Sequence, residues 1–122
     1  MSTALITAGV LTVLLAAAHS YLGERYILVP LFRTTELPPL LGRQDLTKQT
    51  LRFAWHITSV FALGFASLLW LIGRTGGVEG PAVAVIIAAC CAISGAMALV
   101  GSRGRHLSWI VFFAIAGLAW FA

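Results

Sequence analysis

Three histidines and one glutamate are the residues of this chain with the widest chemical scope, because imidazole nitrogens and carboxylates bind transition metals. They are His19, His56, His106 and Glu24. Three histidines, or two with a glutamate, suit zinc, copper or iron, and two histidines on facing helices can hold haem iron from both sides. The sequence therefore predicts a metal ion or haem. His19 and His56 are the expected cofactor ligands, and the expected metal ligands are His19, His56, Glu24 and His106.

Further polar residues are expected in the same layer. Arg52, His56 and Ser59 recur at i, i+4 and i+7, which places them on one helix face. Glu24 is the expected ion-pair partner of Arg52, and Tyr21 belongs to the same layer. An alternative use of this region is to hold an anionic headgroup or a quinone oxygen, with basic donors at Arg52, Arg103, Arg105 and His106.

Each of these residues also has a purely structural interpretation. His106 lies between arginines and the start of an apolar block, which is typical of an interfacial histidine, and His19 can bond to a helix carbonyl. His56 can bond across helices, and Glu24 with Arg52 can be a structural ion pair at a membrane edge. The sequence contains no HExxH, P-loop, GxSxG or CxxC motif, and it indicates no catalytic residue.

The elements that would position these residues are apolar blocks. Hydrophobic residues make up 60% of the 122 residues and charged residues only 10%, whereas soluble domains carry about 25% charged residues. About 20 apolar residues span a bilayer as a helix. The sequence predicts an all-α, polytopic membrane protein of one domain, residues 1–122, in which four transmembrane helices form a bundle. Their expected ranges are 4–22, 51–73, 82–100 and 106–122.

Between the first two blocks lies a stretch that we expect to be a cytoplasmic loop, residues 24–50. Pro38, Pro39 and Gly42 exclude a continuous helix through it. Tyr26 to Phe32 is apolar but too short to span, so it is expected to lie in the interface. Asp45 is the expected N-cap of the next helix.

The distribution of basic residues predicts the orientation. Four spans place seven basic residues on the side of the long loop and only Arg74 on the other side; the seven are Arg25, Arg33, Arg43, Lys48, Arg52, Arg103 and Arg105. Basic residues in short loops mark the cytoplasmic side. We therefore expect both termini outside (N-out, C-out) in a bacterial inner membrane. The formal charge of +4 is explained by this bias, so nucleic acid is not an expected partner.

Small residues mark the helix faces that are expected to pack. A stripe of small and polar residues in the first block should face the bundle; it comprises Gly9, Thr12, Ala16, His19 and Gly23. Ala88, Ala92 and Ala96 recur every four residues in the third block, and Ser94 and Ala98 repeat this spacing on a neighbouring stripe. Both stripes predict a central helix or a dimer contact. Cys90 and Cys91 are adjacent and are interpreted as small packing residues.

The strings HSYLGERY and LRFAWHITS resemble those of small four-helix bacterial membrane proteins that have no assigned function. The resemblance covers the first block, the loop and the start of the second block, and it implies an inner-membrane location without an activity. Small multidrug transporters share the length and the helix count. Their first helix carries an internal glutamate, whereas Glu24 lies at the end of the first block here.

Three functions remain open at this stage. The leading hypothesis is a ligand-binding membrane protein with a His/Glu/Arg site at the cytoplasmic edge, used for electron transfer or metal handling. The second is a non-catalytic accessory subunit of a larger membrane complex. The third is a transporter, which would have to be a homodimer because four helices are few for a pore. Lipid is an expected partner in every case.

Overall fold

The computed structural model describes residues 1–34 and 36–121, and within them helices dominate. The helices are α1 (Thr3–Gly23), η1 (Glu24–Leu28), α2 (Val29–Thr34), α3 (Gln44–Thr75), α4 (Gly80–Gly101) and α5 (Ser108–Phe121). The predicted all-helical class is confirmed. The four apolar blocks correspond to α1, α3, α4 and α5.

The first helix does not end where the sequence suggested. It continues through η1 and α2 to give one apolar segment, Thr3–Arg33, of 31 residues. The predicted loop 24–50 is therefore wrong over residues 24–34, and also from Gln44, where α3 begins. Proline lacks an N–H and clashes with the carbonyl four residues before it in a regular α-helix. Here the wider π-helical turn η1 precedes Pro30, with Val29 N–H donating to the Glu24 carbonyl, so the helix continues.

The start of α3 also corrects a prediction. Arg43, in an extended conformation, is the N-cap, and Asp45 lies in the first helical turn. The Asp45 carboxylate instead accepts two hydrogen bonds from Arg43, both at 3.0 Å. Its second partner is Arg105, whose Nη1 lies 3.0 Å from Asp45 Oδ2. An exposed carboxylate thus joins the beginning of α3 to the turn between α4 and α5.

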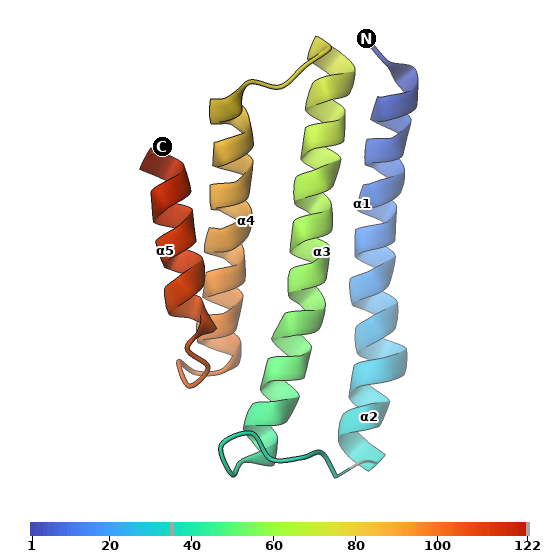
Figure 1. Ribbon diagram of the computed structural model, residues 1–122. Helices are drawn as coiled ribbons and strands as arrows, with labels where there is room; N and C mark the ends of the chain where they lie inside the picture. The colour runs from blue at the N-terminus through green and yellow to red at the C-terminus, as the bar shows by residue number, and fades with distance from the viewer. Residues whose placement is uncertain (35, 122) are drawn as a thin grey trace.

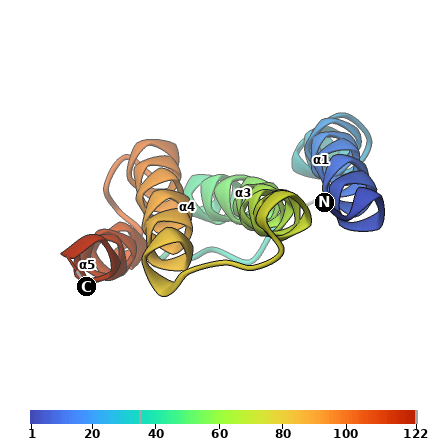
Figure 2. The ribbon, with the colours of Figure 1, turned by 90° about the horizontal axis from the view of Figure 1, so that it is seen from above.

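The helices lie in a single open row rather than around a common axis. α1 packs against α3, α3 against α4, and α4 against α5, and Figure 2 shows the same order from above. In Figure 1 both ends of the chain lie towards the top, while the α2–α3 loop and the α4–α5 turn lie at the bottom. The basic residues of these two connections therefore lie at the same end of the helices, measured along the helix axes.

Small residues at a seven-residue interval form the contact between α1 and α3. The buried residues that follow this interval are Gly9, Ala16 and Gly23 on α1, and Ser59, Ala66 and Gly73 on α3. A Cβ atom on Gly9 would lie 3.2 Å from the Ala66 carbonyl oxygen, and Ser2 N–H donates to the Gly73 carbonyl at 2.7 Å. The predicted stripe on the first block does face another helix. Its smallest members allow the backbones to approach closely.

α4 lies between α3 and α5, as its small residues suggested. The buried positions are Ala88, Cys90, Cys91, Ser94, Gly95 and Ala98. Ala96, by contrast, is exposed, so the contact face follows the neighbouring stripe of Ser94 and Ala98 more closely than the stripe of alanines. A Cβ on Gly64 of α3 would lie 2.6 Å from Cys90 Sγ, and one on Gly95 would lie 3.2 Å from Phe112 Cβ of α5.

Three segments are long and apolar enough to cross a membrane: Thr3–Arg33, Gln44–Thr75 and Gly80–Gly101. α5 has 14 residues, which gives a helix of roughly 21 Å, shorter than a hydrocarbon core of about 30 Å. The fourth predicted span, 106–122, is therefore present as a shorter apolar helix that begins at Ser108. Ala122 lies outside the described residues.

Candidate functional site: a polar chain between α1 and α3

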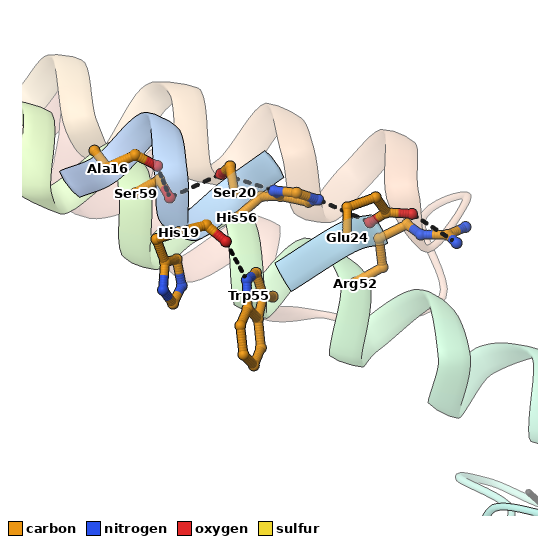
Figure 3. A network of polar contacts seen from close by, with 8 residues as sticks. All are labelled: Ala16, His19, Ser20, Glu24, Arg52, Trp55, His56 and Ser59. Carbon is orange, nitrogen blue, oxygen red and sulfur yellow. Dashed lines mark hydrogen bonds and ion pairs between the residues drawn. The ribbon is translucent and has the colours of Figure 1, made fainter. Parts of the chain in front are cut away.

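A continuous chain of polar contacts links α1 and α3 near the arginine-rich end of the helices (Figure 3). His56 of α3 lies at its centre. Nδ1 of the ring is 2.9 Å from Ser20 Oγ, and Nε2 is 3.0 Å from Glu24 Oε2. Ser20 also contacts the Ser59 hydroxyl at 2.8 Å, and Ser59 donates to the Ala16 carbonyl at 3.1 Å. Both nitrogens of His56 therefore already face side-chain partners.

The second oxygen of Glu24 pairs with Arg52. Its Oε1 lies 2.9 Å from Arg52 Nη2, which is the ion pair expected from the sequence. The Arg52 guanidinium also lies over the ring of Phe32, 5.2 Å from its centroid. Side-chain exposure falls along the chain, from 49% at Arg52 through 32% at Glu24 to 24% at His56. The chain thus runs from an exposed cation to a shielded imidazole, and ends at the buried Ser59.

His19 takes no part in this chain. Its ring stacks on Trp55, with 4.7 Å between the centroids and 5° between the planes. The indole N–H of Trp55 donates to the His19 backbone carbonyl at 3.0 Å. Figure 3 shows these two rings pointing to a different side from the His56 ring. The two histidines named as cofactor ligands therefore serve separate contacts.

His106 lies elsewhere, at the start of α5. Its Nδ1 is 2.8 Å from Ser108 Oγ and accepts from the Ser108 N–H at 3.4 Å. The ring meets Phe53 of α3 edge to face, with centroids 5.3 Å apart. His106 thus satisfies a backbone donor at the first turn of α5, where such donors have no helical partner.

The four predicted metal ligands do not surround one point. Within residues 1–34 and 36–121, no three or more side chains of His, Cys, Asp or Glu are grouped closely enough to hold a metal ion. Tyr21 is 64% exposed, and in the described residues no hydrogen bond links its side chain to the polar contacts around His56. Of the predicted site residues, the structure brings together His56, Glu24, Arg52 and Ser59.

Sequence reasoning gave no role in the site to Ser20 and Trp55. Ser20 lies four residues after Ala16 and four before Glu24, so these three share a face of α1. That spacing could have identified Ser20 as the partner of the His56 face. Nothing in the spacing of Trp55 along the sequence indicates a stack with His19.

Comparisons of the chain with protein-family models, with curated proteins and with solved structures found no match.

Proposed function

We propose that this chain is a small membrane protein whose His56–Glu24 pair takes up and releases a proton. The observation that supports this most is the double engagement of His56. One ring nitrogen faces a hydroxyl, which both donates and accepts, and the other faces a carboxylate. The ligand of the His/Glu/Arg site is then a proton in place of a metal ion or haem.

The same heavy-atom positions accommodate two arrangements of hydrogens. In the first, Ser59 donates to the Ala16 carbonyl, and Ser20 donates to Ser59. Ser20 then has no hydrogen left for Nδ1, so Nδ1–H donates to Ser20. Ionised Glu24 only accepts, so Nε2 also carries a hydrogen and His56 is a cation.

In the second arrangement, the two hydroxyls are reversed. Ser59 donates to Ser20, and Ser20 donates to Nδ1 of a neutral imidazole, while Nε2–H still donates to Glu24. Hydroxyl hydrogens rotate to suit their partners, so His56 can gain a proton without displacement of the helices. Ser20 is the residue that makes both states acceptable.

Charged groups face His56 from more than one element. Glu24 of η1 contacts the ring with one oxygen and holds Arg52 with the other. Arg103 of the α4–α5 turn lines the same groove as His56, and the lining residues of α4 itself are apolar. Glu24 is therefore the charged side chain in direct contact with the His56 ring.

A metal or haem at this position would require larger changes. His56 would have to release Ser20 or Glu24 to free a nitrogen, and His19 would have to leave its stack on Trp55. Ionisable groups at membrane depth also serve in proton relays. The existing hydrogen bonds thus favour the proton as occupant.

We further propose that the site lies at the cytoplasmic side of a bacterial inner membrane, with both termini outside. The distribution of basic residues supports this orientation. Seven of them lie at the end of the helices that holds the site, and only Arg74 lies at the other end. Proton uptake at the site would then follow cytoplasmic pH.

The test is nitrogen NMR of ring-labelled histidine in the purified protein, in lipid nanodiscs, between about pH 5 and 8. We expect one histidine signal, identified by its loss in His56→Gln, to pass from a neutral ring to a ring protonated at both nitrogens. Glu24→Gln should lower the fraction of doubly protonated His56 at a given pH, because it removes the carboxylate that accepts from Nε2. A His56 ring that stays neutral throughout, or a transition unmoved by Glu24→Gln, would contradict the proposal.

A further inference from the structure

A groove of about 740 Å³ lies between α3 and α4, beside the polar chain described above. Its polar end is formed by Gln49, Arg52 and His56 of α3 and by Arg103 of the α4–α5 turn. Its apolar wall continues along α4 through Val100, Met97, Ala96 and Ile93. Val100 is 76% exposed and Ile93 51% exposed. The groove thus joins cationic groups to an uncovered apolar strip.

The charge of the groove is complementary to an anion. Arg52 and Arg103 line it, and the described lining residues include neither Asp nor Glu. Arg52 is already partly neutralised by Glu24, whereas Arg103 is exposed. Arg103 also has a φ of +52°, a left-handed backbone conformation that is unfavourable for residues other than glycine, asparagine and aspartate. The turn thus holds a guanidinium at the polar end of the groove.

The polar end and the apolar wall of the groove are arranged like the headgroup and acyl chain of a lipid in one leaflet. The polar end lies at the arginine-rich end of the helices, and the apolar wall extends from Val100 towards the middle of α4. A headgroup placed at the arginines would therefore have its acyl chain directed towards the centre of the bilayer. Arginine guanidinium groups match phosphate oxygens in both charge and geometry.

We propose that this groove binds an acidic phospholipid of the surrounding bilayer. Its phosphate would lie between Arg52 and Arg103, and one acyl chain would lie against Ile93, Met97 and Val100. Acidic phospholipids are attracted by basic residues at a membrane surface, and each such residue strengthens binding about fivefold. The site adjoins the proposed proton-binding pair, because His56 lines the groove and Arg52 also pairs with Glu24.

The test is native mass spectrometry of the full chain released from nanodiscs that contain phosphatidylglycerol and phosphatidylcholine with identical acyl chains. We expect retained phosphatidylglycerol in preference to phosphatidylcholine. Arg103→Gln should reduce that preference about fivefold. Arg25→Gln is the matched control, because it removes the same charge at the same end of the helices but outside the groove. It should have no comparable effect on the lipid preference.

A second variant separates the groove from general surface charge. Ala96 is an exposed lining residue, so the larger side chain of Ala96→Phe should narrow the groove. Phosphatidylglycerol retention should then weaken although every charge is kept. Equal retention of the two lipids, or equal effects of Arg103→Gln and Arg25→Gln, would overturn the proposal. Displacement of the lipid by soluble glycerol phosphate at similar concentration would also overturn it, because the acyl chain would then contribute nothing.

Discussion

At the residue scale, one step along α3 separates two kinds of interaction. Trp55 and His56 are consecutive, and successive side chains of an α-helix point in directions about 100° apart. Trp55 therefore stacks on His19 and donates to its carbonyl, while His56 enters the chain formed by Ser20 and Glu24. The first contact joins the two helices, and the second forms the His56–Glu24 pair for which proton binding is proposed.

The Trp55 contact should contribute measurably to stability. Trp55→Phe keeps an aromatic ring but removes the N–H that donates to the His19 carbonyl, and a hydrogen bond of this kind contributes about 1 kcal/mol. We expect a lower transition midpoint when unfolding in a denaturing detergent is followed by circular dichroism. Trp120→Phe is the control, since Trp120 is 62% exposed. Equal midpoints for the two variants would contradict a stabilising role for the Trp55–His19 contact.

At the element scale, the seven-residue repeat of small residues determines how α1 meets α3. Gly23 is its most demanding position, because the repeat brings it against the rigid indole of Trp55. A Cβ on Gly23 would overlap the indole of Trp55, with Nε1 as the nearest atom. The polar chain depends on this close approach, since His56 and Glu24 belong to different helices.

Gly23→Ala should therefore destabilise the helix pair. The methyl group would displace the indole and break its bond to the His19 carbonyl, and overpacking of this kind costs roughly 1–3 kcal/mol. The measurement is the same detergent-unfolding midpoint. Gly117→Ala is a matched control, because no atom lies within 4 Å of its added Cβ and alanine favours a helix over glycine by roughly 0.5–1 kcal/mol. If Gly23→Ala is as stable as Gly117→Ala, the close contact is not required.

At the scale of the whole molecule, the single row of helices leaves broad apolar faces exposed on α1, α4 and α5. Lipid as solvent accounts for such faces, since apolar side chains carry no penalty there. The same arrangement places the two basic connections together at the end that holds the polar chain. Under the proposed function, orientation in the membrane would decide which compartment supplies the proton.

Single-cysteine labelling tests the orientation. In a background with Cys90→Ala and Cys91→Ala, a cysteine at Gly77 lies in the α3–α4 turn and a cysteine at Pro39 in the α2–α3 loop. We expect a membrane-impermeant maleimide to label Gly77→Cys in intact spheroplasts and Pro39→Cys only after the membrane is opened. The reverse pattern would invert the proposed orientation.

The sequence by itself determined the helical class, the apolar segments and the gathering of basic residues at one end, because these follow from composition and block length. It also indicated the shared face of Arg52, His56 and Ser59, since helical periodicity determines which residues lie on one face, and it indicated the ion pair of Arg52 with Glu24. Periodicity does not determine rotation between helices. Only the tertiary structure separated His19 from His56, introduced Ser20 and continued the first helix through the π-helical turn before Pro30. The positions of His19, His56 and Ser20 depend on the close approach of α1 and α3 at Gly9, Ala16 and Gly23, a packing effect between segments distant in the chain.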